Sequence, residues 1–575
     1  MSADTPDETP DDMFVEIVRS GTVWRFEREF LESNWTCLFG RGCKGILDHD
    51  ATELNQGCCS LGAHFGATVA GWVAAPWVDQ LGLDELGPWS PDMDLEATFR
   101  TFPTPGGPPP SVRLLEDNET AWVERWRLLA AARERIDTAS FIVRDDVFGL
   151  SFLGHLVQRK NDGVAVRLFV DAHGTKMARN VFTEDYLDEV AGAGIEVKVY
   201  RPLPARIATA VLTLEPAAAI ASEHDKLILV DRQQALLGGR NVGAEYFADH
   251  ALSPDAFHDV DVLVEGAATC RALERAYDAE YTCGAAKLVK PESVNLSSQR
   301  DELLGAYRAM DAWLRGRPQD AADAAGAPWL SVLARDHPGL HGALADPRPP
   351  AVRTEVRLLD SAPRHTRADD AITIGLRRLL ASSKHTVLIE SPYLVLSEEA
   401  VKLLVAAGER GVAITIVTNS PSSSDNAVSQ AFFMEQWPEI LARVKHMRLF
   451  VRGDGHNLHG KTAVFDDSVS VVSTYNLDPV SIYIQGEVAL VATSPEFAAR
   501  VSAPARRMIA QRGPTTYEYQ IARDEDGEPV LDGDGMPQVV FGPRDHSDPD
   551  AWTALAAWWK LLRTMKDVAG FDPIF

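Results

Sequence analysis

One pattern of ionisable side chains occurs twice in this chain of 575 residues. Residues 224–241 read HDKLILVDRQQALLGGRN, and residues 459–476 read HGKTAVFDDSVSVVSTYN. Each copy has a His, a Lys two positions later, an Asp seven positions after the His, then a pair of small residues and an Asn. The members are His224, Lys226, Asp231, Gly238, Gly239 and Asn241, and His459, Lys461, Asp466, Ser473, Thr474 and Asn476. Repetition of so long a pattern predicts two related halves.

The repeated residues suit chemistry on a phosphodiester. Side chains two apart in a strand share a face, so the His and Lys of each copy point the same way. A neutral imidazole can attack phosphorus while a protonated one donates a proton to the leaving oxygen. Two ammonium groups and two Asn amides can hold the non-bridging oxygens, so this chemistry requires no metal. We therefore expect the two motifs to face each other across one pocket.

Three pairs of residues support the motifs. Small residues, such as Gly239, let the backbone approach the phosphate. A carboxylate beyond each motif, Asp259 or Glu487, can hold the far nitrogen of a His and fix its tautomer. Asp231 and Asp466 point away from the His face, which predicts a structural role for both.

The segments before each motif alternate helix and strand in the same order, which predicts α/β halves with a mostly parallel sheet. In the first half we expect helices at 121–135, 148–160 and 182–191, and strands at 138–143, 164–171 and 195–200. In the second half we expect helices at 368–382, 397–409 and 426–444, and strands at 386–390, 412–418 and 447–451. Two such halves should pack about a pseudo-two-fold axis.

The doubled motif resembles that of the phospholipase D superfamily, and the flanking text is closest to bacterial cardiolipin synthase-like proteins. The segments that carry the likeness are GGRNVGAEYF (238–247), FHDVDVLVEG (257–266), IESPYLV (389–395), TNSPSSSDN (418–426) and STYNLDPVSIYIQGE (473–487). The resemblance covers roughly 112–290 and 353–505. It implies a two-step reaction in which a lipid headgroup leaves, a covalent phosphohistidine forms, and water or a second alcohol takes the phosphatidyl group.

The resemblance also assigns roles by position. It makes His224 the nucleophile and His459 the general acid, although the residues themselves leave that order open. Asp259 and Glu487 would each orient the His of their own half. The phosphate-binding set would be Lys226, Lys461, Asn241, Asn476, Gly239, Thr474 and Ser481. Two positions depart from the family pattern: Ser473–Thr474 replace Gly-Ser, and Val480 stands where an Arg is common.

A different kind of site is suggested by the N-terminal cysteines. Four of the six Cys residues lie close together: Cys37, Cys43, Cys58 and Cys59. Clustered thiols in a chain poor in Cys are typical of a structural zinc or iron site. Reduced thiols in a small core, or a redox pair, are the alternatives.

Charge and composition limit the partners. Hydrophobic residues make up 45% and charged residues 24%, which is typical of globular domains. The net charge of −27 disfavours nucleic acid and opposes attraction to anionic lipid over the whole surface. No signal peptide or membrane-spanning run is expected, which favours the cytoplasm with peripheral contact at the inner face of the membrane. The apolar run 203–221 is either core or a lip that contacts acyl chains.

The sequence thus predicts six regions. These are a disordered acidic tail (1–13), a Cys-rich module (14–105), a first phospholipase D-like lobe (111–290), a linker (291–351), a second lobe (352–512) and a C-terminal tail with an amphipathic helix (513–575). The expected function is phosphatidyl transfer on phospholipids. A phospholipase D hydrolase or nuclease, and a metal-binding scaffold with a vestigial catalytic unit, remain alternatives, and the oligomeric state is open.

Overall fold

The computed structural model contains two compact units, Met1–Asp79 and Gln80–Phe575. The structure describes residues 14–19, 22–27, 86–175, 186–202, 221–290, 299–362, 370–511, 513 and 515–546. In the first unit the described residues form one antiparallel pair, β1 (Phe14–Arg19) and β2 (Thr22–Glu27). The predicted Cys cluster, the acidic tail, residues 203–220 of the apolar run and the helix expected near 550–566 lie outside the described residues.

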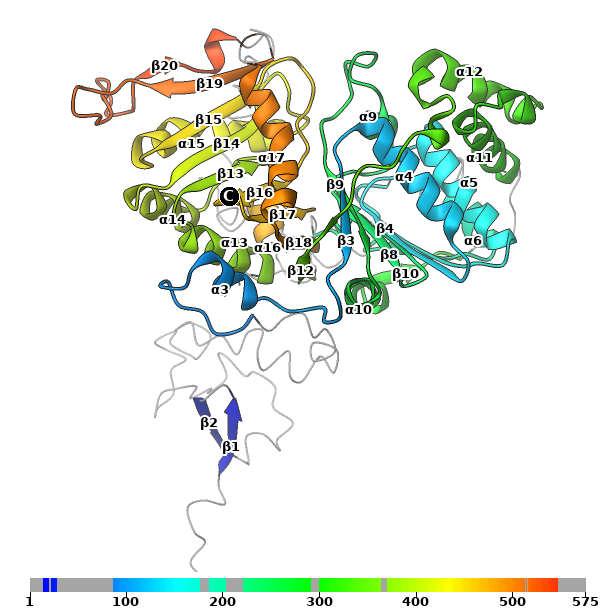
Figure 1. Ribbon diagram of the computed structural model, residues 1–575, viewed down its shortest axis with the longest axis horizontal. Helices are drawn as coiled ribbons and strands as arrows, with labels where there is room; N and C mark the ends of the chain where they lie inside the picture. The colour runs from blue at the N-terminus through cyan, green and yellow to red at the C-terminus, as the bar shows by residue number, and fades with distance from the viewer. Residues whose placement is uncertain are drawn as a thin grey trace, which may run out of the picture. The chain divides into compact units, whose positions relative to one another are not determined.

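The second unit contains two lobes, each built on a nine-stranded sheet (Figure 1). The first sheet has the order β10-β6-β5-β4-β7-β8-β9-β3-β11. Its strands are β3 (Ser111–Leu115), β4 (Arg135–Ser140), β5 (Ala165–Asp171), β6 (Glu196–Tyr200), β7 (Leu227–Val230), β8 (Gln234–Gly238), β9 (Asp261–Glu265), β10 (Ala286–Leu288) and β11 (Val352–Arg353). The sheet is mixed, because β4, β5 and β6 are parallel and the other neighbours are antiparallel.

The second sheet repeats this arrangement in the order β12-β18-β17-β16-β13-β14-β15-β19-β20. Its strands are β12 (Glu355–Ser361), β13 (Thr386–Glu390), β14 (Ala413–Asn419), β15 (Met447–Arg452), β16 (Thr462–Phe465), β17 (Val469–Ser473), β18 (Glu487–Thr493), β19 (Thr516–Ile521) and β20 (Val539–Phe541). Strands β13, β14 and β15 form the parallel part. The prediction of a mostly parallel sheet is therefore wrong for both lobes, because short hairpins after each motif (β7–β8 and β16–β17) force antiparallel pairing.

Helices cover each sheet. The first lobe carries α4 (Asn118–Ala131), α5 (Val147–Asn161), α6 (Tyr186–Gly192), α9 (Ala244–Phe247), α10 (Ala267–Thr282), α11 (Arg300–Leu314) and α12 (Ala327–Asp336). The second carries α3 (Leu95–Arg100), α13 (Ala371–Ser382), α14 (Glu398–Glu409), α15 (Ala427–Arg443), α16 (Pro479–Tyr483) and α17 (Pro495–Ala510). The predicted helices and strands before the motifs are found among the described residues, with ends that differ by at most four residues. The predicted helix starts at 182 and 368 lie outside the described residues. None of the described helices is long and apolar enough to cross a bilayer.

Two predicted boundaries cut through these lobes. Leu95, Phe99 and Phe102, which were assigned to the N-terminal module, are buried in the hydrophobic core of the second lobe. The predicted linker contains α11, whose Leu303 and Met310 are buried in the core of the first lobe. Apolar side chains on both segments therefore join them to the adjacent lobe.

The inner faces of the two sheets meet in one hydrophobic core. This core combines side chains of the first lobe, such as Leu229 and Val262, with side chains of the second, such as Val464 and Leu490. Both motifs lie at the end of this seam, because β7 begins directly after Lys226 and β16 begins directly after Lys461. Figure 1 shows the two lobes side by side, and the pseudo-two-fold relation between them stays a prediction.

Candidate active site

The Asp of each motif organises the turn after the motif strand. Asp231 has a φ of 51° and Asp466 a φ of 47°, in the left-handed region that Asp tolerates better than most residues. The Asp231 carboxylate accepts three backbone N–H groups, from Arg133, Glu134 and Arg135. The Asp466 carboxylate accepts the equivalent three, from residues 384–386. These contacts are consistent with a structural role, which stays a prediction for both residues.

The histidines and the carboxylates pair across the two lobes. His224 Nδ1 lies 2.9 Å from Oε2 of Glu487, a residue of the second lobe. His459 Nδ1 lies 2.6 Å from Oδ2 of Asp259, a residue of the first lobe. The two carboxylates are the ones that the sequence singled out, but the prediction that each orients the His of its own half is wrong. Each His depends on a carboxylate from the other lobe.

Backbone pairing between the lobes explains this exchange. The residue before His224, Glu223, forms a parallel bridge with Gly486, which directly precedes Glu487. Leu458, directly before His459, forms the equivalent bridge with His258, which directly precedes Asp259. The His224 N–H donates to the Gly486 carbonyl (3.0 Å), and the His459 N–H donates to the His258 carbonyl (2.6 Å). Each motif is thus aligned with the carboxylate strand of the opposite lobe.

The two carboxylates are held by different neighbours. Glu487 accepts hydrogen bonds from the Thr474 hydroxyl (2.5 Å) and the Ser481 hydroxyl (2.7 Å) in addition to His224. Asp259 accepts the backbone N–H of Val260 (2.7 Å). A Cβ atom on Gly239 would lie only 2.0 Å from Asp259 Oδ1, so that glycine is required to make room for the carboxylate. Gly239 and Thr474 therefore contact the His-holding carboxylates, whereas the sequence assigned them to phosphate.

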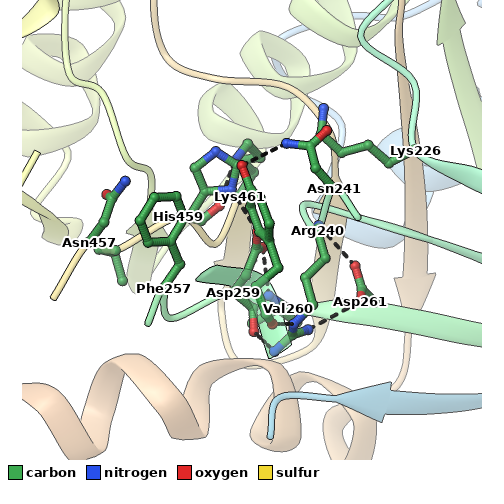
Figure 2. Close-up of polar contacts among 12 residues, drawn as sticks. Lys226, Arg240, Asn241, Phe257, Asp259, Val260, Asp261, Asn457, His459 and Lys461 are labelled. Carbon is green, nitrogen blue, oxygen red and sulfur yellow. Dashed lines mark hydrogen bonds and ion pairs between the residues drawn. The ribbon is translucent and has the colours of Figure 1, made fainter. Parts of the chain in front are cut away.

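Both motif lysines are buried beside the histidines. Lys226 Nζ donates to the carbonyl of His224 (2.7 Å), and Lys461 Nζ donates to that of His459 (2.5 Å). Figure 2 shows Lys226 and Asn241 of the first lobe together with His459 and Lys461 of the second. Burial lowers the pKa of both lysines, that of Lys226 to about 7. An anionic group entering the site would favour their charged forms.

The ionisable groups of the two lobes act on one another. The pKa of His224 lies well below its usual value. Burial is the largest cause, and the charges of Lys226, Lys461 and His459 lower it further. The charges of both lobes therefore act on His224, which is consistent with one shared site. Burial and Lys461 lower the pKa of His459 although Asp259 opposes the shift.

The two carboxylates respond in opposite directions. Burial raises the pKa of Glu487 to about 7. Burial also acts to raise the pKa of Asp259, but His459 and Lys461 outweigh it and lower that pKa.

The two motif asparagines differ. In the first lobe, Asn241 Oδ1 accepts the N–H of Ile142 (3.0 Å), and Nδ2 donates to the Tyr246 hydroxyl (2.8 Å). In the second lobe, Asn476 Oδ1 is buried and has no hydrogen-bond partner within the described ranges. Both residues are buried, and their predicted contact with phosphate stays a prediction.

Several residues of the site were not singled out in the sequence. The rings of Phe141 and Tyr246 pack edge-on against His224 and His459, with centroids 4.9 and 5.4 Å apart. Arg240 is buried behind Asp259, donates to its carbonyl (2.5 Å) and pairs with Asp261 (3.1 Å), as Figure 2 shows. Phe141 lies outside both motifs and outside the segments that carry the family resemblance. Arg240 and Tyr246 lie inside one of those segments, GGRNVGAEYF.

Glu390 is a further buried acid of the second lobe that the sequence did not single out. It ends β13, and its Oε1 would lie 2.1 Å from a Cβ on Gly460. The pKa of Glu390 is raised to about 8, mainly by burial and to a smaller extent by the charge of Asp259. Gly460 lies between His459 and Lys461, so Glu390 occupies the space that this glycine leaves.

Comparison with known proteins identifies the two lobes. A family model described as "Cardiolipin synthase, PLD-like domain" matches residues 126–279 and 376–509, which together make up half of the chain. Cardiolipin synthase C of Escherichia coli is 24% identical over 430 residues, covering 71% of this chain and 86% of that protein. An uncharacterized protein of Helicobacter pylori is 25% identical over 410 residues, covering 68% of this chain and 77% of that protein.

A solved structure has the same fold. The phosphatidylserine synthase of Haemophilus influenzae superposes with a TM-score of 0.51 at 12% identity, covering 82% of this chain and 97% of that one. The doubled motif, the two mixed sheets and the matched residues lead to one conclusion. The chain belongs to the cardiolipin synthase-like, phospholipase D-like domain family.

Proposed function

We propose that this protein transfers a phosphatidyl group between phospholipid alcohols through a covalent phosphohistidine. The observation that supports the proposal best is the crossed pairing of His224 with Glu487 and of His459 with Asp259, beside two buried lysines. An Nδ1–H that donates to the carboxylate in each pair would leave Nε2 available to the substrate. Lys461 Nζ also lies 2.9 Å from His459 Nδ1. Two imidazoles presented in this way can act as nucleophile and general acid on one phosphorus atom.

In the first step His224 Nε2 attacks the phosphorus, and the bond from phosphorus to the leaving oxygen breaks. The leaving oxygen takes a proton from His459 Nε2. Asp259 stabilises the protonated form of His459, and its lowered pKa favours the ionised carboxylate at neutral pH. Lys226 and Lys461 stabilise the charge that develops on the non-bridging oxygens.

In the second step an acceptor alcohol gives its proton to His459, and its oxygen displaces His224 from phosphorus. The same intermediate is hydrolysed when water takes the place of the alcohol. Hydrolysis is therefore the second candidate, and the crossed pairs favour neither acceptor. A substrate of this class resides in a bilayer, so we expect contact with a membrane surface.

The test is incubation of the full chain with phosphatidylglycerol or phosphatidylcholine vesicles and analysis of the lipid products by mass. Cardiolipin from phosphatidylglycerol supports transfer, and phosphatidic acid from either lipid supports hydrolysis. Cleavage of nucleic acid without turnover of lipid would contradict the proposal. A His224→Ala variant controls for contaminating activity.

A further inference from the structure

The first lobe buries three carboxyl groups on the side of its motif that faces away from the catalytic residues. Glu223 and Asp225 alternate with His224 and Lys226 along an extended backbone, so their side chains leave it on the opposite side. Glu280 reaches them from α10. One oxygen of each of the three lies within 4.8 Å of the others. None of the three residues is more than 3% exposed.

Donors satisfy these carboxyl groups only in part. Glu223 Oε1 accepts the backbone N–H of Asp225 (3.2 Å). Glu223 Oε2, Asp225 Oδ1 and Glu280 Oε1 are buried and have no hydrogen-bond partner in the part of the chain that the structure describes. Burial of several unpaired carboxylates is strongly unfavourable unless a cation or protons compensate them.

The second lobe shows that the fold does not need a cluster of three acids here. Leu458 and Gly460 occupy the positions of Glu223 and Asp225 around the second motif His. Met508 lies 21 residues after Glu487, and Glu280 lies 21 residues after Asp259. Met508 therefore occupies the position in the second lobe that Glu280 occupies in the first. Leu458 and Met508 are buried together in an apolar cluster. The first lobe has carboxyl groups at all three positions, whereas the second has apolar side chains at two of them and the Glu390 carboxyl group in the space beside Gly460.

We propose that Glu223, Asp225 and Glu280 bind a hard divalent cation of the Mg²⁺, Mn²⁺ or Ca²⁺ class. Such ions take carboxylate oxygens as ligands, and no softer donor stands among the three. Asp360, a fourth buried carboxyl group, lies close enough to act on Glu223 and Glu280 electrostatically and could complete the shell. Without a cation, burial raises the pKa of Asp225 to about 7, and those of the other two rise as well.

The location of this site gives it a positioning role. Its ligands flank His224 in the chain, and the cation would fix the backbone of residues 223–225 from the side opposite the substrate. The ion takes no part in the chemistry proposed above. Its binding is measured without turnover, so the test is independent of the proposed function.

The test is equilibrium dialysis of the full chain, treated with EDTA, against Mn²⁺, which binds thiols weakly and so avoids the N-terminal cysteines. We expect one Mn²⁺ per chain, displaced by Mg²⁺ or Ca²⁺. Glu280→Gln should weaken binding at least ~100-fold, because loss of a ligand exceeds the usual effect of an outer-shell change. The matched control is Glu390→Gln, which removes a buried carboxyl group of the second lobe and should leave Mn²⁺ affinity unchanged.

Thermal unfolding of the same variants gives a second measurement. In EDTA, Glu280→Gln should raise the unfolding temperature because it relieves repulsion among the acids. Mn²⁺ should raise the unfolding temperature of the original chain but not that of the variant. Absence of Mn²⁺, Mg²⁺ and Ca²⁺ binding below ~1 mM would overturn the proposal in favour of shared protons. Equal Mn²⁺ affinity in Glu280→Gln and the original chain would overturn it as well.

Discussion

The two lobes present the same catalytic skeleton in different surroundings. In the first lobe the His-holding acid is the shorter Asp259, and Gly239 leaves the room that its carboxylate needs. In the second lobe the acid is the longer Glu487, which the Thr474 hydroxyl steadies from the position equivalent to Gly239. Each acid thus lies against the residue at the same motif position of its own lobe, Gly239 in the first and Thr474 in the second.

The comparison also shows that neither lobe is a catalytic unit alone. Each His is oriented from across the seam, so a change in one lobe should impair the His of the other. The pairs differ in electrostatics too, because the pKa of Asp259 is lowered and that of Glu487 is raised to about 7.

The largest effects are expected from removal of the histidines. His224→Ala and His459→Ala should each lower phosphatidyl transfer by roughly 10⁴-fold or more, because the nucleophile or the general acid is lost. The two variants should differ on a p-nitrophenyl phosphodiester, whose leaving group needs no acid. Release of p-nitrophenol should persist in His459→Ala and be absent in His224→Ala. The reverse result would exchange the two roles.

Gly239→Ala should have the next largest effect. The new Cβ would collide with Asp259 Oδ1 at 2.0 Å and displace the carboxylate from His459. A misplacement of this size lowers turnover by about 10²-fold. Steady-state kinetics measures the loss, with Gly284→Ala as the control because a Cβ there meets no atom within 4 Å. Unchanged turnover in Gly239→Ala would show that Asp259 is not closely packed.

Thr474→Val tests the corresponding contact in the second lobe. The substitution keeps the shape of the side chain but removes the hydroxyl that donates to Glu487 (2.5 Å). Loss of a hydrogen bond to a charged group is worth about 1.5–3 kcal/mol, so kcat should fall roughly tenfold or more. Thr474→Ser, which keeps the hydroxyl, should retain most of the activity. Equal losses in both variants would assign the effect to packing instead.

Substitution of Asp231 or of Asp466 should lower the stability of the protein to a similar degree. It should affect catalysis less than substitution of the histidines, Gly239 or Thr474. Asp231→Ala and Asp466→Ala each remove the acceptor of three backbone N–H groups. Each should lower the free energy of unfolding by about 1–3 kcal/mol, measured by denaturant titration. The Asn variants, which keep an acceptor and tolerate positive φ, should lose less. A much larger loss of activity than of stability would contradict the structural role.

Much of this arrangement could be predicted from sequence because it is local. The strand at 386–390 and the helix at 398–409 follow from periodicity and turn residues, and both are found within one residue of the prediction. Duplication of the motif correctly indicated two lobes and one shared site. The carboxylates at 259 and 487 were also found, since each begins a buried strand-like run.

The crossed pairing could not be predicted in this way. A carboxylate that follows a His in the same half is near it in sequence, but the bridges from Glu223 to Gly486 and from Leu458 to His258 exist only after the lobes dock. The antiparallel share of each sheet was missed for a related reason, because periodicity does not report strand direction. Contacts that depend on packing between distant segments remained beyond sequence reasoning.

The crossed pairing is tested most directly by the rate of phosphohistidine formation in carboxylate variants. Single-turnover reaction with a p-nitrophenyl phosphodiester, followed by peptide mass analysis, measures the adduct on His224. We predict that Glu487→Gln slows adduct formation by about 10²-fold or more, because His224 loses the carboxylate that fixes its tautomer, and that Asp259→Asn leaves it nearly unchanged. Slow adduct formation in Asp259→Asn with a normal rate in Glu487→Gln would contradict the account.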